Sequence, residues 1–510
     1  MKPRRTVAVL VAVLALTVTG CTAVGTTSDS GGTGGPAAGN GSLTVLVAAD
    51  GGQNYDPQTN ASPSSGEFMM PVFETLLKED AHGTISPGLA TAWKYSGDGT
   101  VLTLTLRGGV SFQDGTAFDS AAVKSNIHRG QTTPKSVISG QLAAIASVDT
   151  PDPATVVLHL KSAAGSLPGF LAGPAGMMGS PHAWPNADYA THPVGTGPWS
   201  VSESSQPGSD MVYTAYQGYW NSPARKVSTI HIRVGAEATF VPGLTGNTVQ
   251  AVMLTGAPTD GATLSAAGLP VTDSGLSYLH LLYLNKSGVF ADPRIREAVS
   301  LAIDRTAICS SLLGGACTVA AQPVQPKSWA YDSSLAVPRQ NVDQAKTLLA
   351  QAGHPAGFAF TAVVASTGTQ LQTELTAIQP MLAKANITMK ISPLPVAQLL
   401  PTLDAGTAQA YYSVNTGGAD PAIPLATMSA PAYNPGGYQD PALSAASAAA
   451  GAATTQAART TAYRQVSAAY QNSAFNVVVL NQNLQYATAK GVSGVSAQDP
   501  LVLDLRGAGQ

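Results

Sequence analysis

Charged side chains are scarce in this 510-residue sequence. Lys, Arg, Asp and Glu make up 11% of it, against about 25% in typical globular domains. The 26 basic and 29 acidic residues leave a formal charge of −3, and no basic block stands out among them. Nucleic acids and other polyphosphates are bound by clustered Lys and Arg. The composition therefore argues against a nucleic-acid partner.

Short catalytic motifs are also missing. The sequence contains no G-x-S-x-G, S-x-x-K or H-E-x-x-H pattern, the signatures of common hydrolases. Its eight histidines never lie close enough in sequence for a local metal motif. We therefore predict that the chain is not an enzyme, has no metal site and needs no cofactor, which sets aside an exported hydrolase.

Cysteine is rare, and the first of the three has a distinctive setting. Lys2, Arg4 and Arg5 precede an apolar run at 7–16, which is too short to span a bilayer and is typical of a signal peptide. The segment Val18-Thr19-Gly20-Cys21 resembles a bacterial lipobox, in which the leader is cut before a cysteine that carries diacylglycerol. We predict a lipoprotein signal peptide at 1–20 and lipidation at Cys21. A plain secretory signal and a twin-arginine leader are the alternatives.

The segment after Cys21 is rich in glycine and serine and has no apolar periodicity. Such a composition cannot bury enough surface to fold, so residues 21–42 are predicted to be the lipidated cysteine and a flexible tether. The two acyl chains of diacylglycerol suffice for stable anchoring. We therefore place the folded body outside the cytoplasm, in the periplasmic space or its equivalent, held to the cell membrane by lipid.

Removing Cys21 leaves the pair Cys309 and Cys317. Outside the cytosol an even pair favours a disulfide, and closing so short a loop contributes roughly 2.5 kcal/mol in the chain-entropy model. Two buried free thiols are the alternative. A metal site has little support, because no histidine or second cysteine pair lies near in sequence.

The hydrophobic pattern beyond the tether mixes strands and helices. Residues 42–49 and 276–287 predict buried strands, whereas 292–308 and 341–353 show helical spacing. Residues 358–394 read as strand, helix, strand, which is a βαβ unit of a parallel sheet. The Ala-rich stretch 441–472 predicts helix, followed by a buried strand. These patterns indicate an α/β protein, and its length implies two or three domains.

Four segments, in order, resemble one protein family. They are PGLATAWKYSGDGTVLTLTLRGGVSFQDGTAFDSAAVKSNI at 87–127, HPVGTGPW at 192–199, DPRIREAVSLAIDRTAI at 292–308 and DQAKTLLAQAG at 343–353. They are similar to the signature blocks of family 5 of the solute-binding proteins of bacterial ABC importers. That family includes binding proteins for dipeptides, oligopeptides and nickel complexes.

The resemblance implies a fold. Family members have a type II periplasmic-binding-protein fold, with two α/β lobes, a cleft between them and an extra domain, as in cluster C. Carried to this sequence, it places lobe I at 43–77, 191–272 and 473–510, the extra domain at 78–190, and lobe II at 273–472. The solute is expected between the lobes, where ligands commonly bind.

Two loops are the candidate ligand sites. The first, 50–57, follows a predicted strand at the position where α/β sheets place ligands. The second, 411–421, falls where peptide-binding members carry a pattern like G-W-x-x-D-x-x-x-P. Aligned on Pro421, that pattern puts Gly417 in place of the aspartate that holds a peptide's amino terminus. The candidates are Asn54, Tyr55, Tyr412, Asn415, Thr416, Gly417, Gly418 and Asp420.

The expected function follows from the resemblance. The chain would capture a small organic solute, an oligopeptide or peptide-like molecule first, and deliver it as a monomer to the permease subunits of an ABC importer. Gly417 leaves a non-peptide solute open, either a sugar or a metal chelate. A receptor that no longer feeds a transporter is the other alternative.

Overall fold

The computed structural model describes residues 41–49, 52–60, 63–255, 259–415, 420–498 and 502–509. The predicted signal peptide, Cys21 and the predicted tether up to residue 40 lie outside the described residues, as do three candidate ligand residues, Thr416, Gly417 and Gly418. Ser42, the last residue of the predicted tether, is the first residue of a strand. Within the described ranges, no helix has both the length and the apolar character needed to cross a membrane.

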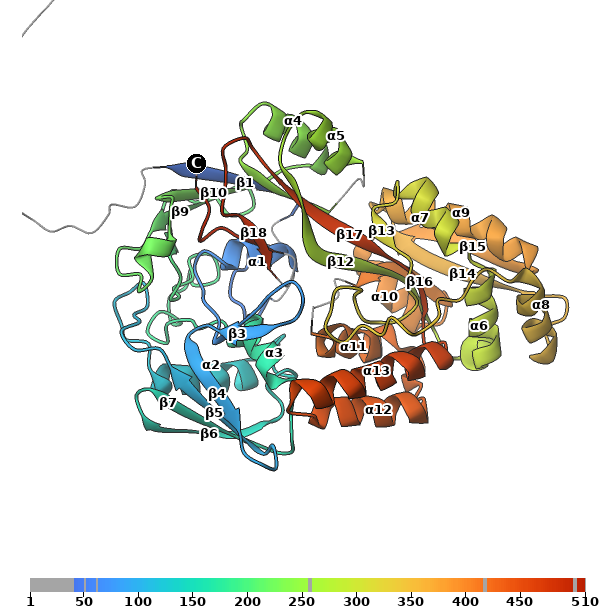
Figure 1. Cartoon of the computed structure of the whole chain (residues 1–510), viewed down its shortest axis with the longest axis horizontal. Helices are drawn as coiled ribbons and strands as arrows, with labels where there is room; N and C mark the ends of the chain where they lie inside the picture. The colour runs from blue at the N-terminus through green and yellow to red at the C-terminus, as the bar shows by residue number, and fades with distance from the viewer. Residues whose placement is uncertain are drawn as a thin grey trace, which may run out of the picture. The chain divides into compact units, whose positions relative to one another are not determined.

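A long mixed sheet is the central element of the fold (Figure 1). Its strands follow the order β15-β14-β16-β12-β17-β11-β1-β10-β9-β8, with β13 added on β17. The strands are β1 (Ser42–Val47), β8 (Trp199–Val201), β9 (Asp210–Ala215), β10 (Thr229–Val234), β11 (Ala251–Leu254), β12 (Val271–Leu284), β13 (Cys317–Thr318), β14 (Phe358–Ala365), β15 (Ile387–Leu394), β16 (Ala410–Asn415) and β17 (Val477–Thr488).

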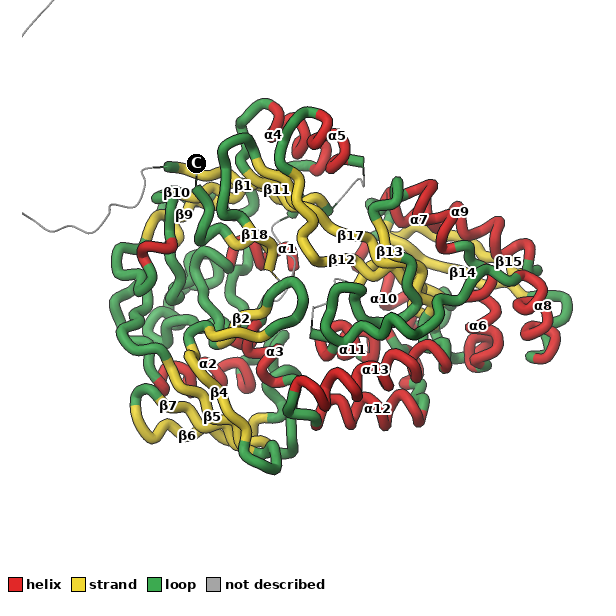
Figure 2. Tube along the Cα trace, in the orientation of Figure 1, coloured by secondary structure: helices red, strands yellow, loops and turns green. Residues whose placement is uncertain are grey.

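Three smaller sheets complete the β-structure (Figure 2). One has the order β4-β5-β7-β6, and the other two are the pairs β2–β3 and β18–β19. Their strands are β2 (Leu77–Glu79), β3 (Ile85–Pro87), β4 (Ala90–Tyr95), β5 (Val101–Leu106), β6 (Ile145–Asp152), β7 (Thr155–Leu160), β18 (Ser496–Gln498) and β19 (Val502–Asp504).

The helices pack on these sheets. They are α1 (Pro63–Met69), α2 (Ser120–Thr132), α3 (Leu167–Ala172), α4 (Phe240–Thr245), α5 (Asp260–Ala266), α6 (Pro293–Ala302), α7 (Arg305–Leu312), α8 (Val342–Gln351), α9 (Thr369–Lys384), α10 (Val396–Asp404), α11 (Ala422–Ser429), α12 (Pro441–Ala452) and α13 (Gln456–Asn472). The predicted helix at 292–308 is two helices, because the Asp304 side chain accepts from the amide of Ala307 and starts a new one. The predicted βαβ unit is confirmed, since β14 and β15 pair in parallel around α9.

The cores separate two lobes and an extra domain. The lobe I core surrounds β1, β10 and β11, and the extra-domain core lies within 76–178. Lobe II has a core on each face of β12: Leu282 and Leu284 pack on one face, whereas Leu281 and Tyr283 pack on the other. This alternation is what a strand buried on both faces produces.

Two antiparallel strands, β12 and β17, run from one lobe into the other (Figure 1). The start of β17, at 477–480, packs in the lobe II cores, and its end pairs with β11 of lobe I. The prediction assigned all of 473–510 to lobe I, so the structure moves the start of this strand to lobe II. The other domain boundaries stay predictions.

Two of the three arginines of the 292–308 segment bind the backbone at the start of β17 and just before it. Arg296 is fully buried and donates to the backbone oxygens of Ser473 and Ala474. Arg305 donates through two nitrogens to the backbone oxygen of Val478. Neither guanidinium pairs with a carboxylate in the described structure, and carbonyl groups satisfy both instead. The family motif thus holds α6 and α7 onto the strand that links the lobes.

Candidate binding cleft

A cavity of about 770 Å³ lies between the two lobes. On the lobe I side it is bounded by Glu237 and Thr255, which follow β10 and β11, and on the lobe II side by Gly368, which follows β14. β1 pairs in parallel with β10 and β11, and β14 pairs in parallel with β15 and β16. The carboxyl ends of parallel strands are where open α/β sheets bind ligands, so this cavity is the candidate site.

The two linking strands supply one side of the cavity. Tyr278 and His280 come from β12, and Gln482 comes from β17. His280 and Gln482 are almost fully buried. Because these strands belong to both lobes, a solute held against them contacts the segment that would bend if the lobes moved.

A buried polar network lies behind these side chains. His280 Nδ1 lies 2.9 Å from a carboxylate oxygen of Glu374, and His280 Nε2 lies 3.1 Å from Oε1 of Gln482. The Tyr412 hydroxyl donates to Glu374 at 2.6 Å. Both ring nitrogens of His280 therefore lie against oxygen atoms of neighbouring side chains. The network therefore fixes the orientation of every side chain in it.

The network also tunes its acidic member. Burial alone raises the pKa of the Glu374 carboxyl, but the attraction of His280 and the hydrogen bonds outweigh burial, so the pKa lies below its usual value. Burial, reinforced by Glu374, raises the pKa of Tyr412 well above its ordinary value. Glu374 is therefore a carboxylate and Tyr412 a neutral donor at neutral pH.

The lobe I wall of the cavity carries negative charge. Glu237 and Asp260 both line it, and the Thr255 hydroxyl donates to Glu237 at 3.3 Å. No Lys or Arg is among the described lining residues. Partial burial raises the pKa of Asp260. A wall with two carboxyl groups and no cation suits a ligand that brings a positive group.

The lobe II wall is the first turn of α9. Gly368 precedes the helix without a side-chain cap, and Thr369, Gln370 and Leu371 line the cavity with it. The first backbone N–H groups of a helix have no partner within the helix. This wall therefore offers hydrogen-bond donors, opposite the acceptors of lobe I.

The structure places Asn54 and Tyr55 inside lobe I rather than on the described cavity. Asn54 donates to the Thr59 hydroxyl and accepts from the amide of Asp56. Tyr55 has no exposed surface and its ring stacks on Phe68 with centroids 5.1 Å apart. A ring without exposed surface offers no face to a solute, so here Tyr55 is a packing residue.

Tyr412 and Asn415 have internal partners too. Tyr412 is fully buried in the network behind His280, so it supports the cavity instead of lining it. Asn415 is nearly buried, and its side-chain nitrogen donates to the Tyr283 hydroxyl at 3.3 Å. Val414, one residue earlier in β16, lines the cavity in their place.

Asp420 is committed to an ion pair. Its carboxylate is fully buried and lies 2.7 Å from Arg459, whose guanidinium stacks over Trp329. The pattern G-W-x-x-D-x-x-x-P, counted back from Pro424 instead of Pro421, puts its aspartate at Asp420. In this structure the charge of Asp420 is already balanced within the protein, so a direct contact with a solute amine stays a prediction.

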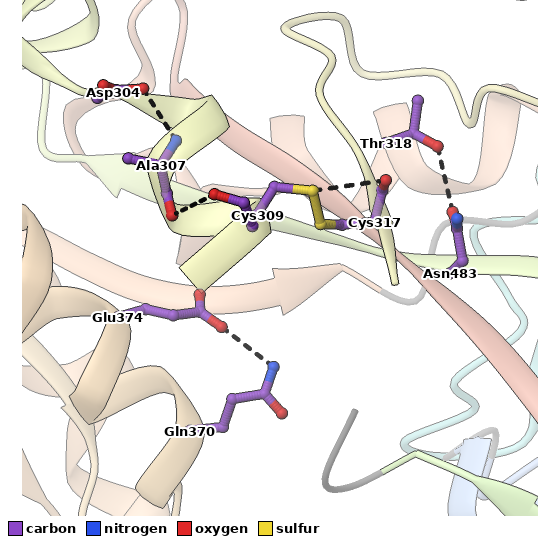
Figure 3. The surroundings of a disulfide bond; sticks show 9 residues. Asp304, Ala307, Cys309, Cys317, Thr318, Gln370, Glu374 and Asn483 are labelled. Atoms are coloured by element: carbon purple, nitrogen blue, oxygen red, sulfur yellow. Dashed lines mark hydrogen bonds between the residues drawn. A yellow bond between two sulfur atoms is a disulfide. The ribbon is translucent and has the colours of Figure 1, made fainter. Parts of the chain in front are cut away.

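The two remaining cysteines form a disulfide (Figure 3). Cys309 lies on α7, Cys317 on β13, and their Cα atoms are 5.9 Å apart, within the ordinary range. Cys317 pairs with Gln482 across β13 and β17. The bridge therefore ties α7 to the strand position that lines the cavity.

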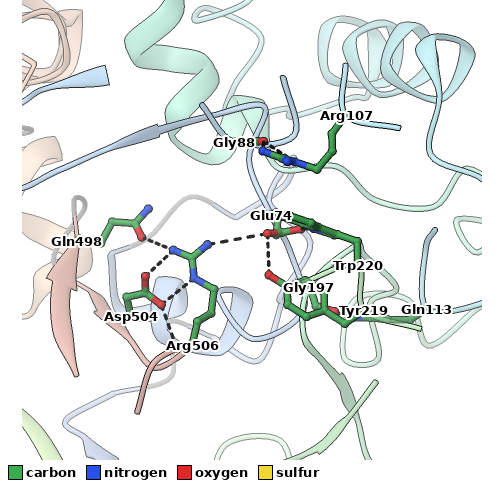
Figure 4. Close-up of polar contacts among 10 residues, drawn as sticks. All are labelled: Glu74, Gly88, Arg107, Gln113, Gly197, Tyr219, Trp220, Gln498, Asp504 and Arg506. Carbon is green, nitrogen blue, oxygen red and sulfur yellow. Dashed lines mark hydrogen bonds and ion pairs between the residues drawn. The ribbon is translucent and has the colours of Figure 1, made fainter. Parts of the chain in front are cut away.

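A second polar cluster lies away from the cavity (Figure 4). The buried carboxylate of Glu74 accepts from the Tyr219 hydroxyl at 3.0 Å and from Trp220 Nε1 at 2.6 Å. Arg506 lies 4.0 Å from Glu74 and also pairs with Asp504. Burial raises the pKa of Glu74. These groups satisfy one another and join the C-terminal segment to lobe I, which is a structural role.

Sequence reasoning missed most of the cavity. Glu237, Asp260, His280 and Gln482 lie in four separate segments, and none of them stands in a recognisable motif. The signal that could have found two of them is structural: Glu237 and Asp260 follow β10 and β11 within a few residues. Among the described residues, no group of three or more His, Cys, Asp and Glu is arranged to hold a metal ion.

Comparison with known proteins gives the family. The model of the bacterial extracellular solute-binding proteins, family 5, matches residues 84–436. The glutathione-binding protein GsiB of Salmonella paratyphi A is 30% identical over 404 residues, which cover 74% of this chain and 76% of GsiB. The GsiB of Escherichia coli O157:H7 is 28% identical over 412 residues, with the same coverage.

Solved structures share the fold. The periplasmic binding protein DppA of Helicobacter pylori, in complex with peptide STSA, has a TM-score of 0.77 at 21% identity and covers 92% of this chain and 97% of its own. NikA of Brucella suis, in complex with Fe(III)-EDTA, has a TM-score of 0.78 at 22% identity and covers 90% and 97%. The mixed α/β fold with two lobes is thereby confirmed as the type II fold. The chain belongs to family 5 of the bacterial extracellular solute-binding proteins of ABC importers.

Proposed function

We propose that the solute of this ABC-importer receptor is an oligopeptide or peptide-like molecule, bound in the cavity between the lobes. The observation that carries the proposal is the lobe I wall, where Glu237 and Asp260 face the cavity without a lining Lys or Arg. An amino group is the cation that peptides bring, and a carboxylate is its usual partner.

The rest of the cavity supports the same class of solute. Its volume of about 770 Å³ lies within the range of small-molecule sites, about 300–1,000 Å³. Thr255, Thr369, Gln370 and Gln482 add neutral hydrogen-bonding groups that suit peptide amides. Tyr278 and Leu371 add apolar surface for side chains.

Delivery follows from the architecture. Only β12 and β17 are shared by the two lobe cores in the described structure, so we propose that the lobes close on the solute by bending at these strands. The predicted lipid on Cys21 would hold the receptor beside the permease. The protein would act as a monomer and perform no covalent chemistry.

Native mass spectrometry of the protein purified from its own host tests the solute class. We expect a co-purified mass that matches a peptide or peptide-like molecule. The midpoint temperature of thermal unfolding should then rise when peptides of two to eight residues are added, because a ligand at 100 times its Kd stabilises the folded protein by about 2.7 kcal/mol. A shift with a glycan or a metal chelate, and none with peptides, would replace the peptide assignment by the non-peptide alternative.

The anchor has a separate test. The mature protein should partition into detergent and carry the mass of diacylglycerol, and Cys21→Ser should abolish both. A Cys21→Ser protein that still partitions into detergent would exclude the lipid on this residue.

A further inference from the structure

The first turn of α9 leaves donors open toward the cavity. Thr369 N–H bonds to Thr367, and Gln372 N–H bonds to Gly368. No described residue accepts from the N–H groups of Gln370 and Leu371, and both residues line the cavity. α9 has 16 residues, so its N-terminus also carries the partial positive charge of a helix dipole.

A buried side chain points to the same ligand group. Gln482 is only 3% exposed and lines the cavity. Its Oε1 accepts from His280 and, at 2.9 Å, from Gln370, whereas its Nε2 donates to no described residue. This nitrogen belongs to a residue that lines the cavity, so it is available to an acceptor there.

The network determines which end of the Gln482 amide faces the cavity. Gln370 Nε2 donates to the Glu374 carboxylate at 3.1 Å, and its second hydrogen reaches Gln482 Oε1. Because Glu374 only accepts, Gln370 cannot be turned round without losing that bond. The Gln482 oxygen is therefore held inside the network, and its NH₂ group is left for the solute.

We propose that the cavity binds its solute as a zwitterion of fixed polarity, with a carboxylate on the α9 N-terminus and the Gln482 amide, and an ammonium on Glu237 and Asp260. This rests on the proposed function and deepens it. The donors belong to lobe II and the linking strand, and the two carboxyl groups belong to lobe I. One solute with both charges therefore bridges the lobes, whereas a solute with one charge engages only one of them.

Matched peptides test the polarity on the unaltered full chain. The probes are three tripeptide pools of identical sequences: one with free termini, one amidated at the C-terminus and one acetylated at the N-terminus. Isothermal titration calorimetry gives the Kd of each pool. Losing a hydrogen bond to a charged group should weaken binding about tenfold or more, so each blocked pool should bind at least about tenfold more weakly than the free pool.

Substitution then assigns each end to its wall. Gln482→Glu keeps the acceptor that His280 and Gln370 use but replaces the free donor by a second acceptor. This variant should bind the pool with free termini much more weakly than the unaltered protein does. The difference in Kd between that pool and the amidated pool should therefore become smaller. Glu237→Gln with Asp260→Asn should instead narrow the gap between the free and acetylated pools. Gln351→Glu, an exposed change on α8, is the matched control and should leave every Kd unchanged.

The outcomes separate the two proposals. If none of the pools binds, the peptide assignment fails and the polarity fails with it. If the three pools bind alike, peptides are the solute but the polarity is wrong. If amidation weakens binding yet Gln482→Glu leaves the gap intact, the carboxylate lies elsewhere and the inference is overturned. Because the comparison of pools needs no variant, a substitution that fails to fold does not remove the test.

Discussion

Glu67 gives the fold a pH dependence that can be worked out from its surroundings. This α1 side chain is almost fully buried, and the only described donor to its carboxyl group is the backbone amide of Leu503 on β19, at 3.2 Å. Burial raises the pKa of Glu67 from 4.5 to about 8, although the Leu503 bond works in the other direction. At neutral pH the folded protein therefore holds a proton that the unfolded chain releases.

The sign follows from that difference. The folded-state pKa is the higher one, so the stability linked to this proton is fully present below pH 4.5 and is lost as the pH rises toward 8. Each pH unit between the two values costs about 1.4 kcal/mol, which amounts to about 3 kcal/mol at pH 7. Glu67→Gln removes this titrating group. The free energy of unfolding of the variant, relative to that of the wild type, should therefore increase by about 3 kcal/mol from pH 4.5 to pH 7.

Urea denaturation of both proteins across that pH range measures the effect. The difference between variant and wild type at each pH is the quantity to follow, because contributions from other groups then cancel. Glu203→Gln, at an exposed position, should show no such pH-dependent difference. A Glu67→Gln protein whose stability runs parallel to that of the wild type from pH 4.5 to 7 would refute the reasoning.

Three further outcomes follow from buried contacts. Arg296→Met leaves several carbonyl acceptors without donors, so the free energy of unfolding should fall by about 3 kcal/mol or more. An unchanged midpoint of urea unfolding would show that the contacts of Arg296 with the backbone before β17 do not stabilise the fold. Reducing the Cys309–Cys317 bridge should lower the free energy of unfolding by roughly 2.5 kcal/mol, measured by urea unfolding with and without dithiothreitol. Identical unfolding curves would show that the bridge does not stabilise the fold. Asp420→Asn leaves the buried Arg459 without its carboxylate partner, so the midpoint temperature of thermal unfolding should drop by the amount that corresponds to a loss of about 3–5 kcal/mol. Asp343→Asn, on the exposed start of α8, should change this temperature little.

The sequence allowed the local structure to be predicted where one pattern dominated. The strand at 42–49, the helix at 341–353 and the βαβ unit at 358–394 all appear close to their predicted bounds. The helix at 292–308 was overextended, because its apolar stripe continues through Asp304, which caps a second helix. No helix was predicted at α3, because this short element is rich in Pro and Gly and is stabilised by packing in the extra-domain core.

The site was harder to predict for a physical reason. A side chain such as Tyr55 or Tyr412 is as suitable for packing as for binding, and only the fold decides which face it presents. Both lie in cores. By contrast, Gln482 reads as one more residue of a buried strand, and its free amide emerges only once His280 and Gln370 are seen to occupy its oxygen.

The residues that reveal the family and those that line the cavity are different residues. The signature segments at 87–127, 192–199, 292–308 and 343–353 contribute nothing to the described cavity wall. Their known contacts are structural: Arg296 and Arg305 hold β17, and a Cβ at Gly197 would collide with the backbone of Val72. The contacts that hold the fold and the side chains that face the cavity are therefore supplied by different positions. For this reason a resemblance that identifies the receptor leaves its solute to be read from Glu237, Asp260, Gln482 and the first turn of α9.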